Sequence, residues 1–167
     1  MKDNELLQAG GLAGASVPSP THSPHRILVV DDNSDVRLLY TEVLARPGYH
    51  VDAAEDGAAG WEAIQANNYN LLITENEMPG LTGVELVRKL RSARMAVPVV
   101  MAAVRLPTLE LVQNPPLQLA ALLPKPFYLS ELLQTVRAVL RVTASPREQI
   151  TPLPFRQSQS SAGGLRL

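Results

Sequence analysis

The chain has 167 residues, of which 46% are apolar and 4% aromatic, so one domain with an aliphatic core is expected. It contains no cysteine, which excludes disulfides, iron–sulfur clusters, thiolate zinc sites and cysteine nucleophiles. Its net charge of −1 gives no basic footprint for nucleic acid, and no apolar run reaches the about 20 residues of a membrane helix, so a cytoplasmic protein without nucleic-acid or membrane partners is expected.

Composition divides the chain into three parts. Residues 1–24 and 144–167 are rich in small residues and proline, and both are expected to be flexible tails. Residues 25–143 alternate short apolar runs with helical periodicity, which is typical of repeated strand–helix units around a parallel sheet. A single α/β domain is therefore predicted for residues 25–143.

The first strand and helix are predicted from a change of periodicity after residue 30. Residues 27–30 are apolar without alternation, as in a strand buried on both faces. From Ser34 onward, apolar side chains recur at helical spacing until Pro47 and Gly48 stop the helix. The acidic pair Asp31-Asp32 lies between the two elements, at the carboxyl end of the strand.

Four further strands follow the same alternation. We predict strands at about 49–54, 71–74, 97–103 and 120–123, and helices at about 57–67, 83–93 and from 130 onward. Pro107 and the pair Pro115-Pro116 fall where a helix between the last two strands belongs, and each interior proline costs about 3 kcal/mol there. That helix, the fourth of five, is expected to be short or broken.

The strand ends bring chemistry-bearing residues to one edge of the predicted sheet. In an open parallel sheet, loops converge beyond the carboxyl ends of the strands. Asp31, Asp32, Glu75, Ala103 and Lys125 should therefore meet in space. Three carboxylates facing one lysine suit Mg²⁺, which takes oxygen ligands, and phosphate, which a lysine pairs with as a point charge.

Three motifs resemble the receiver domain of response regulators, the CheY-like superfamily. They are Val30-Asp31-Asp32, Glu75-Asn-Glu-Met-Pro79-Gly80-Leu-Thr-Gly83 and Lys125-Pro126-Phe127. The separations are 43 residues from Asp32 to Glu75, 28 from Glu75 to Ala103 and 22 from Ala103 to Lys125, all typical of that family. The resemblance covers about residues 25–143. It implies a flavodoxin-like, doubly wound five-stranded parallel sheet of order 2-1-3-4-5 with five helices.

The resemblance also implies roles for individual residues. Asp32 would be a direct ligand of Mg²⁺, Asp31 a ligand through water, and the backbone carbonyl of Glu77 a third contact. Lys125 would pair with the phosphoryl group.

Three switching positions depart from the family pattern. The phosphoacceptor position holds Glu75 in place of aspartate, the hydroxyl position holds Ala103, and the aromatic switch position holds Leu122. Glutamate carries its carboxylate about 1.5 Å farther out, and an error of about 1 Å can cost about 10²-fold in phosphoryl transfer, which depends on positioning. The sequence therefore predicts a degenerate pseudo-receiver that is phosphorylated inefficiently and lacks the relay to report it.

Two explanations of Glu75 remain open at this point. Glu75 reaches Lys125 and imitates the phosphorylated state, or the site has decayed and the fold persists as a docking surface. The second is slightly favoured, because locking a switch without moving parts achieves little. In either case we expect a stand-alone module of a two-component system or phosphorelay that is not an enzyme and acts by phosphorylation-independent protein–protein interaction.

The expected partner is a protein, such as a histidine kinase or an effector. The partner surface implied by the resemblance combines the predicted helix after residue 103, the strand at 120–123 and the last helix. One alternative is a working response regulator phosphorylated slowly at Glu75 or at the Asp31/Asp32 pair. A less favoured one is a Mg²⁺-dependent phosphohydrolase, which requires Asp-x-Asp where this chain has Asn33.

Other polar residues receive simpler interpretations. The three histidines have no metal-ligand spacing and are expected on the surface: His22, His25 and His50. The basic residues of the third helix are expected on its solvent face: Arg88, Lys89, Arg91 and Arg94.

Overall fold

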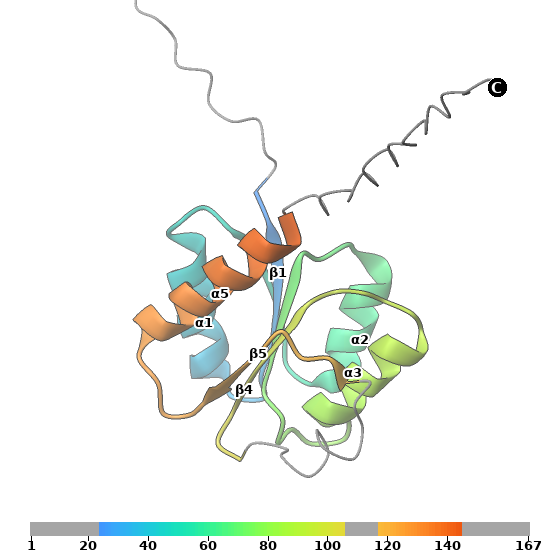
Figure 1. Ribbon diagram of the computed structural model, residues 1–167. Helices are drawn as coiled ribbons and strands as arrows, with labels where there is room; N and C mark the ends of the chain where they lie inside the picture. The colour runs from blue at the N-terminus through green and yellow to red at the C-terminus, as the bar shows by residue number, and fades with distance from the viewer. Residues whose placement is uncertain (1–23, 106–116, 145–167) are drawn as a thin grey trace, which may run out of the picture.

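Five parallel strands form one sheet with helices on both faces (Figure 1). The computed structural model describes residues 24–105 and 117–144. The strands are β1 (Arg26–Val30), β2 (His50–Ala54), β3 (Leu71–Thr74), β4 (Val99–Ala103) and β5 (Ala121–Pro124). The helices are α1 (Ser34–Ala45), α2 (Gly57–Ala66), α3 (Gly83–Ser92) and α5 (Leu129–Ala144). The strand order β2-β1-β3-β4-β5 confirms the flavodoxin-like fold predicted from the sequence.

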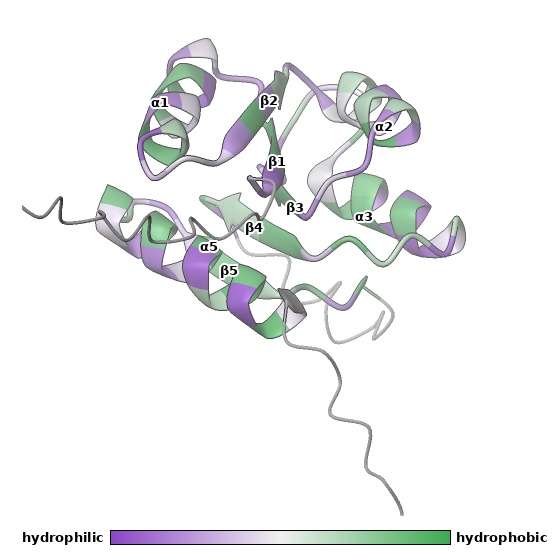
Figure 2. Ribbon diagram, turned by 90° about the horizontal axis from the view of Figure 1, so that it is seen from above, coloured by the Kyte–Doolittle hydropathy of each residue, from purple (hydrophilic) through white to green (hydrophobic). Residues whose placement is uncertain are grey.

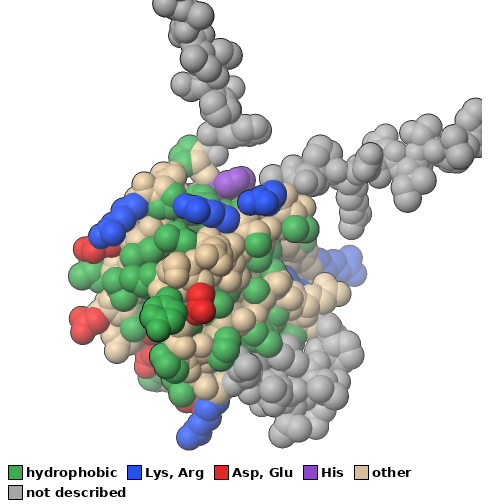
Figure 3. Space-filling model, turned by 60° about the vertical axis from the view of Figure 1, so that its left-hand side comes forward, with side chains coloured by type: hydrophobic (Ala, Val, Ile, Leu, Met, Phe, Trp, Pro, Cys, Tyr) green, Lys and Arg blue, Asp and Glu red, His purple; other side chains and the backbone are tan. Residues whose placement is uncertain are grey.

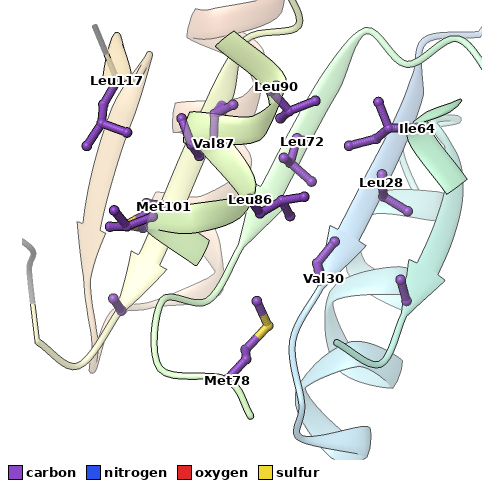
Figure 4. Close-up of a cluster of buried hydrophobic side chains, with 14 residues drawn as sticks. Leu28, Val30, Ile64, Leu72, Met78, Leu86, Val87, Leu90, Met101 and Leu117 are labelled. Carbon is purple, nitrogen blue, oxygen red and sulfur yellow. The ribbon is translucent and has the colours of Figure 1, made fainter. Parts of the chain in front are cut away.

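The sheet separates two apolar layers. Helices α1 and α5 cover one face, and α2 and α3 cover the other (Figures 1 and 2). Because side chains alternate along a strand, β1 supplies Ile27 and Val29 to the first layer and Leu28 and Val30 to the second. Figure 4 shows the second layer, in which α2 and α3 pack onto the sheet. Burial on both faces explains why β1 is an unbroken apolar run.

Helix caps fix where two helices begin. The side chain of Asn33 accepts hydrogen bonds from the backbone N–H groups of Asp35 and Val36 at the start of α1. Thr82 and Glu85 form a capping box at the start of α3, in which each side chain accepts from the other residue's backbone N–H. Both helices therefore start directly after loops that lie at the carboxyl edge of the sheet.

The observed boundaries differ from the predicted ones by one or two residues at most places. The largest difference is at β4, which begins at Val99; Pro98, just before it, contributes only its carbonyl, which accepts from the N–H of Leu72. The expected broken fourth helix, with Pro107 and Pro115-Pro116, lies outside the described residues, as do residues 1–23 and 145–167. None of the helices in the described ranges is long and apolar enough to cross a membrane.

The prediction that Arg91 lies on the solvent face of α3 is wrong. Its guanidinium is partly buried and donates to four backbone carbonyls, those of Met95, Val97, Leu117 and Gln118. Burial lowers the pKa of Arg91. The Arg91 side chain links the segment before β4 to the segment before β5. The helical spacing of the charged residues therefore predicted the wrong position for it.

Candidate functional site

The sheet register places the ends of neighbouring strands side by side. Val30 pairs with Thr74, and Ala103 pairs with Pro124. The ladders continue one residue further, because the N–H of Glu75 donates to Val30 O at 2.9 Å and the N–H of Lys125 to Ala103 O at 2.9 Å. Asp31, Glu75 and Lys125 therefore leave the sheet at the same edge, as the sequence predicted.

Lys125 joins the two buried carboxylates of this edge. Its Nζ lies 2.9 Å from Asp31 Oδ2 and 2.5 Å from Glu75 Oε2. The side chains are 19% exposed for Lys125, 3% for Asp31 and 7% for Glu75. Charges so far removed from water need partners, and each of the three has one here.

Backbone groups hold the remaining carboxylate oxygens. Asp31 Oδ1 accepts from the N–H of Asn33 at 3.0 Å. Glu75 Oε1 accepts from the N–H of Asn76 at 2.7 Å and, at 3.4 Å, from that of Glu77. All four oxygens of the two buried carboxylates are thus engaged, and no buried side-chain nitrogen or oxygen in the described residues lacks a partner.

The ammonium keeps its charge in this setting. Burial by itself lowers the pKa of Lys125, but the hydrogen bonds to Glu75 and Asp31 outweigh burial and raise it above the ordinary value. Two carboxylates against one ammonium leave the buried group with a net negative charge. Asp32, directly beside Asp31, adds a further carboxylate.

Asp32 and Glu77 stand apart from this group. Both side chains are exposed, and within the described ranges Asp32 makes no side-chain hydrogen bond or ion pair. Glu77 Oε1 faces the guanidinium of Arg105 at 3.7 Å. Of the three carboxylates expected to face Lys125, the structure brings two to it.

The same arrangement tests the fit of Mg²⁺. Oxygen ligands suit the cation, but the oxygens of Asp31 and Glu75 are committed to Lys125 and to backbone N–H groups. No group of three His, Cys, Asp or Glu side chains in the described part of the chain could hold a metal ion. As arranged, the residues do not fit a preformed magnesium site.

The two other switch positions lie on the last two strands. Ala103 is fully buried at the end of β4, next to Lys125, and carries no hydroxyl. Leu122, on β5, is partly buried and packs against the α2 and α3 layer. Neither offers a hydrogen-bond donor or an aromatic ring.

Asn76 and Gly83, which were not singled out from the sequence, connect the loop after Glu75 to the start of α3. The carbonyl of Asn76 accepts from the N–H of Gly83, and its side-chain oxygen accepts from the N–H of Val84 at 3.1 Å. A Cβ on Gly83 would lie 2.2 Å from the Glu75 carbonyl oxygen, so only glycine fits there. The capping pattern at Thr82 and Glu85 was the available signal for this junction.

Comparison with protein families gives one match over most of the chain. Residues 27–137 match the family model described as response regulator receiver domain. The chain is 35% identical over 130 residues to Protein PetR of Rhodobacter capsulatus and 39% identical over 125 residues to Response regulator MprA of Mycobacterium sp. (strain KMS). Each match covers 75% of this chain and 54% of the relative, so the chain spans about half the length of these relatives.

Solved structures give the same fold. A CheY-like response regulator receiver domain protein of Methanospirillum hungatei superposes with a TM-score of 0.68 at 25% identity, covering 72% of this chain and 96% of its own. Chemotaxis protein CheY4 of Vibrio cholerae gives 0.65 at 26%, covering 70% and 99%. Response regulator TrrA of Thermotoga maritima, in complex with Mg²⁺ and BeF, gives 0.61 at 29%, covering 69% and 98%.

Proposed function

The chain belongs to the response regulator receiver domain family, and from its site we propose that it is a two-component signalling module that binds a partner protein independently of phosphorylation. The proposal concerns the described domain, because the curated relatives are about twice as long as the matched region. It assigns the domain no reaction of its own.

The proposal rests on one observation: the charged side chains of the site are already bound to one another. Lys125, which would pair with a phosphoryl group, is held by Glu75 and Asp31. Glu75 is 7% exposed, and all of its carboxylate oxygens accept hydrogen bonds, so it is a poor nucleophile for a phosphodonor. Phosphorylation of Glu75 would have to break these contacts first.

The lack of a relay supports the same conclusion. A phosphoryl signal in this family needs a group that moves, and Ala103 has no hydroxyl to be drawn toward the site. Leu122 has no ring that could fill the vacated space. A phosphorylated site would therefore alter the partner surface little, and slow phosphorylation at Asp31 or Asp32 would meet the same obstacle.

The proposed partner surface is the β5–α5 side of the domain. A shallow groove of about 340 Å³ runs there, lined by Ala121 on β5 and by Ala138, Val139 and Val142 on α5. Val142 is 77% exposed, which is high for a valine in a described helix. An apolar groove beside an edge strand suits a protein partner such as a histidine kinase or an effector.

The contact between Glu75 and Lys125 favours a second candidate function. The pair could imitate the phosphorylated state and so keep the partner surface permanently in its active form. Under this reading, partner binding depends on Glu75; under the docking-surface reading it does not.

Partner capture tests both readings. The full chain is immobilised, and bound proteins from the source organism are quantified with and without Mg²⁺ and acetyl phosphate. We expect the same partner at the same yield in both conditions and a loss in Val142→Asp. Equal capture by Glu75→Ala supports a docking surface, whereas a loss in Glu75→Ala with retained folding supports imitation. Capture that requires acetyl phosphate contradicts the proposal.

A further inference from the structure

A group of aromatic and basic side chains lies at the opposite edge of the sheet, where the strands begin. His25 directly precedes β1 and Tyr49 directly precedes β2, and their ring centroids are 6.5 Å apart. The carbonyl of His25 accepts from the N–H of His50 at 3.0 Å, which fixes the two segments together. His25 is partly exposed, in agreement with the surface position expected from the sequence.

A shallow basic hollow of about 250 Å³ opens between these rings and α5. Arg137, Leu140 and Arg141 line it from α5, at the i, i+3 and i+4 spacing that places them on one helix face. Among the described residues, no acidic side chain lines it. Figure 3 shows basic side chains and a histidine gathered along the upper edge, where Figure 1 has the start of β1 and the end of α5.

The partial negative charge at the end of α5 lies away from Arg137. A helix carries partial negative charge at its carboxyl end, and Arg141 in the last turn offsets it. The hydroxyl of Thr143 shares its single hydrogen between the carbonyls of Val139 and Leu140. Arg137 lies about two turns back, and none of the ion pairs between described residues involves it.

An adjoining hollow of about 440 Å³ has different chemistry. Its floor is apolar, with Ile64 and Met95, and its rim carries the amides of Asn67, Asn68 and Asn70. The side-chain oxygen of Asn67 accepts from Arg26, and its side-chain nitrogen donates to the carbonyl of Ala63. The Asn68 side chain is exposed and has no hydrogen-bond partner among the described residues.

His25 lines both hollows, so they adjoin at this residue. We propose that this edge binds a nucleoside phosphate, with its phosphates at Arg137 and Arg141 and its base in the hollow rimmed by Asn68. One guanidinium group can donate to two phosphate oxygens at once. A side-chain amide can both donate to and accept from the edge of a heterocyclic base. A flat base also suits an apolar floor. The site lies at the edge opposite Lys125 and does not depend on the function proposed above.

The test is an NMR titration of the ¹⁵N-labelled full chain. The probes are ATP, GTP, CTP and UTP, with inorganic triphosphate and the free nucleosides as fragments. We expect at least one nucleotide to give saturable shifts at the amides of His25, Tyr49 and Asn68, and to bind at least about tenfold more tightly than triphosphate or its own nucleoside. Glu75→Ala should bind it equally, which separates this site from the other one.

Three variants assign the two halves of the site. Arg137→Gln should weaken the nucleotide and triphosphate about tenfold and leave the nucleoside unchanged. Asn68→Ala should weaken the nucleotide and nucleoside and leave triphosphate unchanged. Arg88→Gln, an exposed arginine of α3 that lines neither hollow, is the matched control and should change nothing.

Two results would overturn the proposal. One is the absence of saturable shifts with all four nucleotides. The other is binding in which triphosphate equals the nucleotide and Arg88→Gln weakens it as much as Arg137→Gln, because that pattern is nonspecific attraction to positive charge.

Discussion

The carboxylate of Glu75 lies against the ammonium of Lys125, with Oε2 2.5 Å from Nζ. The longer side chain at the acceptor position therefore spans the space to the lysine. Asp31 shares the same ammonium from the other side at 2.9 Å. The lysine that would pair with a phosphoryl group in a receiver is thus already paired with carboxylates of its own chain.

Removing the ammonium should destabilise the domain strongly. Lys125→Met leaves Asp31 and Glu75 as two adjacent, buried carboxylates without a counterion, and breaking such a pair costs about 3–5 kcal/mol. Urea unfolding measures the loss. Lys89→Met, at an exposed lysine of α3, is the matched control and should cost less than about 1 kcal/mol.

A second substitution checks that charge is the cause. Adding Glu75→Gln to Lys125→Met removes one of the two unpaired charges, so the double variant should recover part of the lost stability. A double variant that is less stable than Lys125→Met alone would show that the unpaired charge of Glu75 is not what destabilises Lys125→Met.

The close approach at Gly83 predicts a steric effect on the site. In Gly83→Ala the new Cβ would meet the Glu75 carbonyl oxygen at 2.2 Å, so the loop or the helix must shift, at a cost of about 1–3 kcal/mol. The amide NMR signals of Glu75 and Asn76 should move. Gly80→Ala, where nothing lies within 4 Å but φ is +75°, should cost stability without moving those signals.

Arg91 predicts a stabilising contact that the sequence hides. Arg91→Met leaves four backbone carbonyls without their donor, and we expect a loss of about 1–3 kcal/mol in the free energy of unfolding. Arg88→Met, on the exposed face of the same helix, should change it by less than about 0.5 kcal/mol. Equal effects of the two variants would contradict the assigned role.

Arg91 and Gly83 show which features of the structure could not be predicted from the sequence. The fold and the meeting of Asp31, Glu75 and Lys125 were predictable, because apolar runs place the strands and parallel order places their ends at one edge. The roles of Arg91 and Gly83 were not predictable from the sequence. Each role depends on backbone carbonyls of another segment that lie close to the residue only in the folded chain. A charge pattern on a helix carries no information about carbonyls that arrive from other loops.

The arrangement around Lys125 shows a second limit. Sequence spacing placed Asp32 with the other carboxylates, but its side chain points into solvent while that of Asp31 is buried. Successive side chains of an extended backbone point to opposite sides, and the spacing does not say which of the two turns inward.

Alkaline pH should weaken the fold through Tyr69. Burial, and after it a hydrogen bond to the Asp52 carboxylate, raises the pKa of Tyr69 from 10.0 to about 12. The folded state holds this proton more tightly than the unfolded state, so its contribution is complete below about pH 10 and is lost as the pH rises toward 12. The raised pKa values of Tyr40 and Lys125 act in the same direction.

Unfolding curves between about pH 9 and 12 measure this loss. Tyr69→Phe should flatten the fall of stability with pH, while Tyr128→Phe, at a tyrosine that is 78% exposed, serves as the control. A fall in Tyr69→Phe as steep as in the unmodified chain would contradict the raised pKa of Tyr69.

The most direct test of phosphorylation independence is an NMR titration of the full chain with Mg²⁺ and beryllium fluoride, followed by intact mass measurement after acetyl phosphate. We predict shifts confined to residues around Asp32 and Glu75, no propagation to β5 and α5, and no added phosphoryl mass. A large set of shifts that extends to β5 and α5, or a mass increase that disappears in Glu75→Ala, would contradict the account.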